Sequence, residues 1–402
     1  MKKHLPLVCA ALALFSPGSA EAAIEAVSPV GGLAVRLLPD IQREVMALPT
    51  LKERLDFLAS APKSYTSSSA PWRVSRDLVL EIRATGGEKG PWKVQIGKSP
   101  DLGDARTWFI PPSKSSGKDI AITVPMANLE IGARYHWKVS WRGRCGFGCG
   151  PGHGCAKCTN TCETAVCDFV TEDLAPRWIA IEGRVKNIRD LGGRKGLGGR
   201  RVRQNMAFRG QGLNDNSETG ETKGANRLTV EDVGYFTRVL GIKTDLDLRG
   251  PGETADLAES PLGPGVGLII RSSSYYKGIF KPDGMKTMAE NFRVFCDRSN
   301  YPVYFHCIGG ADRTGALAYV LNGVLGVDRH ELETDWESTF YPKIPDANPD
   351  PAFWRRESHL TDGFAKYGDA GTSWSDRIVL YLKDCGITDA EIDTFRAIML
   401  EQ

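Results

Sequence analysis

The chain has 402 residues, of which 41% are hydrophobic and 25% charged, and its formal net charge at pH 7 is +2. This composition excludes a disordered or fibrous protein, and a chain of this length exceeds one ordinary core, so two domains are expected. The charge balance gives no broad basic surface for a nucleic acid, so we expect no nucleic-acid partner and only local binding of an anionic substrate.

Residues 1–22 have the pattern of a secretory signal peptide. Lys2 and Lys3 precede an apolar segment, 5–15, and the small-residue box Ala20-Glu-Ala22 follows it. A basic start, an apolar stretch and small residues at the cleavage position are typical of exported proteins. No later apolar run approaches the length of a membrane span. The sequence therefore predicts a secreted or periplasmic protein without a membrane span, with a mature chain that starts at Ala23.

Residues 23–173 are predicted to form a β-sandwich. Short alternating segments separated by turn residues are typical of that architecture. These segments are 78–82, 92–96, 107–110, 120–124, 135–141 and 166–170. Before them, apolar residues recur at helical spacing over 40–59, with a break at Pro49. The motif Leu129-x-x-Gly132-x-x-Tyr135 resembles the tyrosine corner of fibronectin type III domains, so we expect a module of that type.

A glycine-rich segment, 145–167, contains six cysteines between the last two predicted strands. They are Cys145, Cys149, Cys155, Cys158, Cys162 and Cys167. An even number of cysteines in an exported protein favours three disulfides, whose pairing the sequence does not give. Cys155-x-x-Cys158 with His153 also has the spacing of zinc ligands, but the compartment favours disulfides and we expect no metal. This segment is either the tip that binds an unknown surface partner or a stapled hairpin.

Residues 174–402 are predicted to form an α/β domain. Strand patterns at 244–248, 266–270 and 303–305 alternate with amphipathic helices. Such alternation gives a parallel-rich sheet that is covered on both faces, with its chemistry at the carboxyl ends of the strands. The sequence as a whole therefore predicts a multidomain protein with a β-sandwich followed by an α/β domain.

The stretch from Tyr304 to Gly315 carries the candidate chemistry. An apolar strand is followed by a glycine-bearing loop and by a helix that starts near Arg313. In a tight loop the backbone N–H groups turn inward and, with the helix N-terminus, they suit a tetrahedral oxyanion. The same field and Arg313 would hold Cys307 as a thiolate. Arg313 can also bind two oxygens with its planar fork.

The residues around Cys307 are candidate substrate contacts. Thr314 carries a hydroxyl that can donate to the sulfur, and glycine in the loop permits close approach of the backbone to an anion. The candidate substrate-binding residues are Ile308, Gly309, Gly310, Ala311 and Thr314.

The run His306-Cys-x5-Arg-Thr-Gly315 resembles the signature of the cysteine-dependent protein tyrosine phosphatases. Asn187-Ile-Arg-Asp-Leu-Gly-Gly193 and Asp247-Leu-Arg-x-x-x-Glu253 resemble two further motifs of the bacterial branch, in the family's order. The resemblance covers about residues 185–340. It implies hydrolysis of phosphate monoesters through a phosphocysteine on Cys307, with no cofactor. Arg189 and Asp190 would then brace the loop from behind.

The resemblance also implies a general acid, for which two residues are candidates. The chain has no Trp-Pro-Asp motif. Asp283 follows Pro282 on a glycine-flanked segment after the strand at 266–270, where we expect a movable loop. Asp312 lies in the nucleophile loop itself. Of the two we favour Asp283 as the acid, with Asp312 helping water or substrate.

The expected function is that of an exported protein tyrosine or dual-specificity phosphatase, acting on a phosphorylated protein or a small phosphate monoester. No lysine stands among Ile308, Gly309, Gly310 and Ala311, which favours a singly phosphorylated substrate. Two alternatives remain open. One is an inositol polyphosphate or phosphoinositide phosphatase, and the other is a surface binding protein with an inactive phosphatase-like scaffold.

Overall fold

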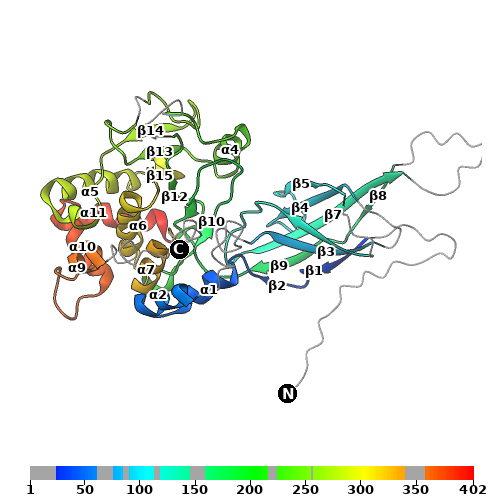
Figure 1. Cartoon of the computed structure of the whole chain (residues 1–402), viewed down its shortest axis with the longest axis horizontal. Coiled ribbons are helices and arrows are strands. Elements are labelled where there is room, and N and C mark those ends of the chain that lie inside the picture. Colours follow the sequence, from blue (N-terminus) through cyan, green and yellow to red (C-terminus); the bar gives the residue numbers. More distant parts are fainter. Residues whose placement is uncertain are drawn as a thin grey trace, which may run out of the picture. The chain divides into compact units, whose positions relative to one another are not determined.

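The structure is a computed structural model, and it describes residues 24–60, 76–84, 90–112, 118–144, 159–215, 224–254, 257–339 and 358–402. It divides into two compact units, residues 1–37 with 76–173 and residues 38–75 with 174–402, whose elements are labelled in Figure 1. The predicted signal peptide and positions 145–158 of the cysteine-rich segment lie outside the described residues.

The first unit consists of two β-sheets. One sheet has the order β1 (Ile24–Ser28), β3 (Leu78–Ala84) and β6 (Asp119–Val124). The other has the order β2 (Leu33–Val35), β9 (Cys167–Thr171), β7 (Arg134–Arg144), β4 (Trp92–Gly97) and β5 (Arg106–Ile110), and β8 (Thr159–Glu163) also pairs with β7. Burial alternates residue by residue along β3 and β6, so each of these strands turns one face inward.

The second unit has a six-stranded sheet. Its order is β10 (Arg177–Trp178), β11 (Arg189–Asp190), β12 (Ala207–Gln211), β15 (Val303–Cys307), β13 (Thr244–Asp247) and β14 (Gly267–Ile270). The last four strands run parallel. β11 pairs antiparallel with β12, and β10 pairs antiparallel with β11. This arrangement confirms the predicted α/β domain with a parallel-rich sheet.

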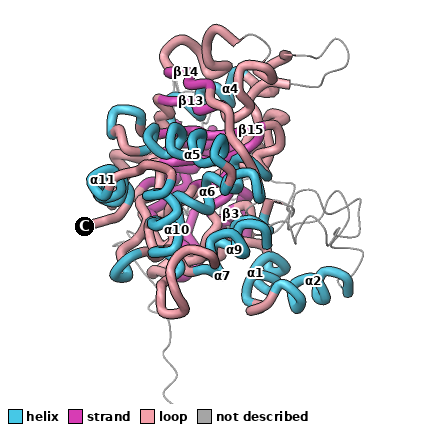
Figure 2. Tube along the Cα trace, turned by 90° about the vertical axis from the view of Figure 1, so that its left-hand side faces the viewer, coloured by secondary structure: helices cyan, strands magenta, loops and turns pink. Residues whose placement is uncertain are grey.

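Helices surround this sheet. They are α1 (Asp40–Ala47), α2 (Leu51–Ser60), α4 (Val230–Gly234), α5 (Pro282–Phe295), α6 (Asp312–Val324), α7 (Arg329–Ser338), α9 (Ser358–Phe364), α10 (Trp374–Asp384) and α11 (Asp389–Met399). Shorter turns are η1 (Leu197–Gly199), η2 (Tyr235–Val239), η3 (Tyr276–Phe280) and η4 (Arg298–Asn300). None of the described helices has the length and apolar character that a membrane crossing requires. Figure 2 shows α5, α6 and α10 in front of the strands.

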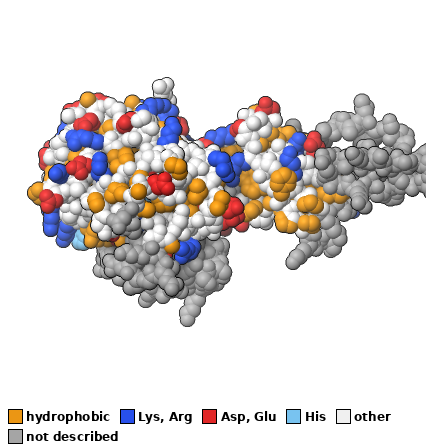
Figure 3. Space-filling view, turned by 90° about the horizontal axis from the view of Figure 1, so that it is seen from above, with side chains coloured by type: hydrophobic (Ala, Val, Ile, Leu, Met, Phe, Trp, Pro, Cys, Tyr) orange, Lys and Arg blue, Asp and Glu red, His pale blue; other side chains and the backbone are white. Residues whose placement is uncertain are grey.

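Alternate residues of β15 pack into two different hydrophobic cores, one on each face of the sheet. Val303 and Phe305 pack with α5 and α6, whereas Tyr304 packs with Phe236 and Leu240 around η2. The sheet is therefore buried on both faces, as expected for parallel strands. On the face in Figure 3, basic and acidic side chains are interspersed over the coloured surface, in keeping with the small net charge.

Helices α1 and α2 belong to the second unit, although the predicted boundary at residue 173 assigns them to the first domain. Val45 is buried in the α/β core. Arg54 is fully buried and donates to both carboxylate oxygens of Glu337 on α7, at 2.6 and 2.7 Å. A buried guanidinium requires such a partner. The helical periodicity of the segment predicts the helices but does not say which core they join.

Candidate active site

The nucleophile loop begins at the carboxyl end of β15, the strand between β12 and β13 in the parallel part of the sheet. Cys307 is the last residue of β15 and pairs with Gln211 at the end of β12. Helix α6 then starts at Asp312. The loop therefore lies at the edge where an α/β fold positions its chemistry, as the sequence predicts.

Cys307 has the environment of a stabilised thiolate. Its side chain is buried, and burial alone would raise the pKa of the thiol. The hydroxyl and amide of Thr314, the charge of Arg313 and the amide of Gly310 outweigh burial, so the pKa lies below its ordinary value. The buried Thr314 hydroxyl has no hydrogen-bond partner among the described residues, so it is free to turn toward the sulfur.

Glu253 holds Arg313 in place. The guanidinium donates to both carboxylate oxygens of Glu253, at 2.6 and 3.0 Å. Burial would lower the pKa of Arg313, but the hydrogen bond to Glu253 and the charge of Cys307 raise it above its ordinary value. A bidentate pair fixes the plane of the guanidinium as well as its charge. The sequence motif contains Glu253 but assigns it no role.

Two side chains behind the loop hold its carbonyl groups. Asn187 Nδ2 donates to the carbonyls of Gly309 and Gly310, at 3.2 and 3.1 Å. Arg209 Nη2 donates to the carbonyl of Gly310 at 2.9 Å. In a trans peptide the following N–H points the opposite way from the carbonyl, so the amides of Gly310 and Ala311 point away from these two side chains. These two N–H groups are therefore free to face the Cys307 side of the loop, the arrangement that an oxyanion requires.

Asp335 on α7 binds the arginine side chains that lie behind the nucleophile loop. Its carboxylate accepts hydrogen bonds from Arg189, Arg194 and Arg209, at 3.0, 2.9 and 2.6 Å. Burial would raise the pKa of Asp335, but the three guanidinium groups hold it well below its usual range. Burial and the charge of Arg189 lower the pKa of Arg209 to about 9. Arg209 therefore remains charged at neutral pH beside Asp335.

Of the two residues expected to brace the loop, only Arg189 belongs to this support. Arg189 donates to Asn187 Oδ1 as well as to Asp335. Asp190 is fully buried, but it binds Arg177 at 2.9 Å and the amides of Gly192 and Asn205. Asp190 on β11 therefore holds the edge strand β10 through Arg177.

The two candidate acids lie in different environments. Asp312 is the first residue of α6, is half-buried, and accepts a hydrogen bond from the Tyr276 hydroxyl. Asp283 is exposed in the first turn of α5, so the expectation of a movable loop at this position is wrong. Pro282 occupies the first helical turn, where its fixed φ suits the helix and its missing N–H has no partner to lose. No hydrogen bond joins Asp283 to the nucleophile loop in the described part of the chain.

The remaining predicted substrate-binding residues lie in the loop between Cys307 and Asp312. Ile308 is 42% exposed, whereas Ala311 is buried. Gly309 and Gly310 are held from behind by their carbonyl groups. The structure therefore brings together all the predicted substrate-binding residues around Cys307, and none of those between Cys307 and Asp312 carries a charge. The described residues contain no cluster of three or more His, Cys, Asp or Glu arranged to hold a metal ion.

Thr314→Val is expected to shift the pH profile of Cys307 alkylation upward, because it removes a donor that lowers the pKa of this thiol. Rates of iodoacetamide labelling against pH, with mass mapping of peptides, measure the midpoint. Burial raises the pKa of Cys296 to about 12 and that of Cys385 to about 11, so these two residues serve as slow internal controls at pH 7. An unchanged midpoint in the variant would show that the hydroxyl does not act on the sulfur.

A protein family and two known proteins are similar to this chain. A family model described as "Tyrosine phosphatase family" matches residues 180–401. A candidate tyrosine-protein phosphatase of Cupriavidus necator is 26% identical over 189 residues, and the match covers 39% of this chain and 64% of that protein. The chain thus spans less than two thirds of that relative's length. The core catalytic domain of a PP-IP phosphatase from S. cerevisiae, in complex with citrate, is 14% identical and has a TM-score of 0.24, covering 39% of this chain and 93% of that one.

Proposed function

The chain belongs to the tyrosine phosphatase family, and on this basis we propose that it hydrolyses phosphate monoesters through a phosphocysteine formed on Cys307. The observation that carries the proposal is a buried cysteine at the carboxyl end of β15, just before the N-terminus of α6, where Thr314, Gly310 and Arg313 lower the pKa of its thiol. A thiolate at the N-terminus of α6, beside a fixed guanidinium, is a nucleophile in a site built for an oxyanion.

In the first step, the Cys307 thiolate attacks phosphorus, the S–P bond forms, and the P–O bond to the leaving group breaks. The loop amides and the Arg313 fork bind the equatorial oxygens, where charge gathers during transfer. Glu253 keeps the fork oriented before substrate arrives. In the second step, water attacks phosphorus, the S–P bond breaks, and phosphate and the thiolate are released.

We assign the proton donor to Asp312. Its support is position, because Asp312 is half-buried in the first turn of α6 next to Arg313, whereas Asp283 is exposed on α5. The Tyr276 hydroxyl holds the Asp312 carboxyl group in place. Asp312 would give its proton to the leaving oxygen in the first step and take one from water in the second.

Phosphotyrosine is the proposed substrate group. The loop positions Ile308 to Ala311 offer no cation for a second phosphate. Tyr275 is 49% exposed and packs edge-on against Tyr276 at 4.9 Å. Since Tyr276 contacts Asp312, this pair provides an aromatic surface beside the acid on which a substrate ring can pack.

We further propose that the protein is exported and that its first unit is a fibronectin III-like β-sandwich that binds a surface partner. The pattern of residues 1–22 supports export. The two sheets and a hydrogen bond of 2.9 Å from the Glu130 amide to the Tyr135 hydroxyl support the sandwich, because a tyrosine corner makes such a bond to upstream backbone. N-terminal sequencing of the protein recovered from the source cell would test export, and an intact Met1 would contradict it.

The purified protein is expected to hydrolyse p-nitrophenyl phosphate, with inhibition by orthovanadate, which occupies the oxyanion site. Rapid acid quenching during turnover should trap a phosphoryl group that maps to the peptide containing Cys307. A protein that is inert under reducing conditions, or that turns over without labelled Cys307, would contradict the proposal. An inert protein would favour the surface binding role.

The assignment of the acid is tested within the same assay by a matched pair of variants. Asp312→Asn should lower turnover of a phosphate ester with a poor leaving group about a hundredfold, with a much smaller effect on p-nitrophenyl phosphate. Asp283→Asn should leave both rates close to wild type. The reverse pattern would assign the acid to Asp283.

A further inference from the structure

A cavity of about 660 Å³ lies in the second unit between η3, α9 and α10. We call it the α9–α10 cavity, and its residues that matter here are Lys277, Phe280, His359, Asp362, Lys366 and Tyr367. Its volume is that of a ligand-binding pocket rather than a packing defect. The proposed reaction at Cys307 uses none of these side chains.

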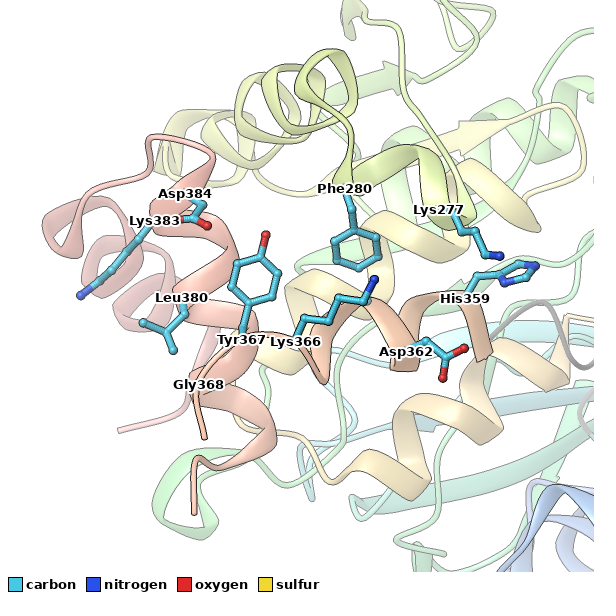
Figure 4. Close-up of a pocket in the computed structure, with 11 residues that line it drawn as sticks. Lys277, Phe280, His359, Asp362, Lys366, Tyr367, Gly368, Leu380, Lys383 and Asp384 are labelled. Atoms are coloured by element: carbon cyan, nitrogen blue, oxygen red, sulfur yellow. The ribbon is translucent and has the colours of Figure 1, made fainter. Parts of the chain in front are cut away.

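One end of the α9–α10 cavity is linked to the first turn of α6 through Tyr276. Figure 4 shows Lys277 and His359 at one end of the row of side chains, and Lys383 and Asp384 at the other. Lys277 directly follows Tyr276, whose hydroxyl donates to Asp312. The Tyr276 and His359 rings lie 6.1 Å apart. A single side chain, Tyr276, therefore connects the cavity to the first turn of α6.

The floor of the cavity is aromatic. Phe280 packs edge-on against Phe364 and Tyr381, with ring centroids 5.0 and 5.2 Å apart, and its ring lies 6.5 Å from that of Tyr367. These contacts hold the floor rigid. A rigid aromatic surface can bury an apolar side chain of a ligand without paying much ordering entropy.

The cations of the cavity are available to a ligand. Neither Lys277 nor Lys366 forms an ion pair with another described residue, whereas Lys383 pairs with Asp389 at 2.7 Å. Lys277 lies at the end next to the loop, and Lys366 lies beside Phe280 in the row. Two available ammonium groups along one concave surface favour an anionic ligand. Asp362 and Asp384 also line the cavity, so its charge is mixed rather than uniformly positive.

We propose that the α9–α10 cavity binds the residues that flank the phosphotyrosine of a protein substrate, with acidic side chains on Lys277 and Lys366 and an apolar side chain on Phe280. This inference rests on the function proposed above. With the phosphotyrosine over Cys307, the neighbouring residues of an extended peptide pass Tyr276 and enter the cavity. An inositol polyphosphate fits less well, because it has no apolar side chain to bury on Phe280.

Paired phosphopeptides test the proposal. One peptide carries glutamates beside the phosphotyrosine and the other carries lysines. The wild type should show a kcat/KM for the acidic peptide about tenfold higher, mainly through a lower KM, because each exposed pair contributes modestly. Lys277→Glu combined with Lys366→Glu should invert this preference, and the preference should shrink as salt rises.

Two controls separate this proposal from the proposed function. Lys243→Glu changes an exposed lysine at the amino-terminal end of β13, the opposite edge of the sheet from the loop, and should leave the preference intact. Hydrolysis of p-nitrophenyl phosphate should be equal in all variants, because this substrate does not reach the cavity. If that hydrolysis is absent in the wild type, the proposed function itself fails.

Three outcomes would overturn the proposal while leaving the function standing. The first is an unchanged peptide preference in the double variant. The second is an equal loss in the Lys243 control, which would show a general charge effect. The third is turnover of inositol hexakisphosphate that exceeds turnover of the acidic peptide and depends on Lys277.

Discussion

Asp335→Asn is expected to lower the free energy of unfolding of the second unit by about 3–5 kcal/mol, the usual cost of removing one partner from a buried ion network. The carboxylate accepts hydrogen bonds from three guanidinium groups, those of Arg189, Arg194 and Arg209, and all are buried. Asparagine has the same shape but no charge, and its amide group would meet a guanidinium with a donor. Three buried cations would then repel one another, with Glu331, 3.8 Å from Arg194, as the remaining carboxylate beside them.

Activity should fall with stability in this variant, because Arg209 also holds the carbonyl of Gly310. Urea unfolding, followed by tryptophan fluorescence, measures the free energy of unfolding. The transition that coincides with loss of activity is the one that belongs to the second unit. Asp393→Asn on α11 is the matched control, since Asp393 is exposed and its replacement should change stability by no more than about 0.5 kcal/mol. Equal midpoints for the two variants would show that Asp335 is not the anchor.

The contribution of the Asp335 carboxylate to the free energy of unfolding depends on pH. Its pKa in the folded protein lies well below the value of about 3.9 for an unfolded aspartate. The folded state therefore binds this proton less tightly, and the stability that Asp335 contributes is fully present above the unfolded pKa. It is lost only as pH falls below that value toward the folded pKa. In Asp335→Asn, the acid-side decline in stability should be shallower.

The sequence alone predicts the parts of the site that are local. Cys307, Gly310, Arg313 and Thr314 fall within one strand, loop and helix, so their spacing determines their geometry. Asp335 lies 146 residues from Arg189 and 126 from Arg209. A contact over such a separation depends on how the sheet and helices pack, and a single sequence carries no local signal for it.

The segment at Pro282 shows the opposite difficulty, in which a local signal has two meanings. Lys281-Pro-Asp-Gly284 is typical of a turn, but proline is equally suited to the first turn of a helix. Gly284 is needed for a close approach, because a Cβ there would lie 2.0 Å from the carbonyl oxygen of Gly278. The close packing of α5 on η3 therefore accounts for the glycine, and Pro282 accounts for the start of the helix.

Gly310→Ala is expected to reduce kcat/KM about a thousandfold, an effect comparable to loss of an oxyanion-hole donor and larger than its cost in stability. A Cβ at Gly310 would lie 2.3 Å from the carbonyl oxygen and 2.4 Å from the carbonyl carbon of Gly210, both backbone atoms that cannot rotate away. Relief of this clash requires the loop to move away from β12, which takes the amide of Gly310 away from Cys307 and the phosphoryl oxygens.

Gly241→Ala separates this clash from backbone strain. Gly241 and Gly310 have the same φ of 65°, but a Cβ at Gly241 meets no atom within 4 Å. Both variants bear the cost of alanine in the left-handed region, about 1–2 kcal/mol, and only Gly310→Ala bears the clash. Activity on p-nitrophenyl phosphate and vanadate affinity should therefore fall together in Gly310→Ala and stay near wild type in Gly241→Ala. Equal losses in the two variants would mean that backbone strain, and not the position of the loop amides, controls the reaction.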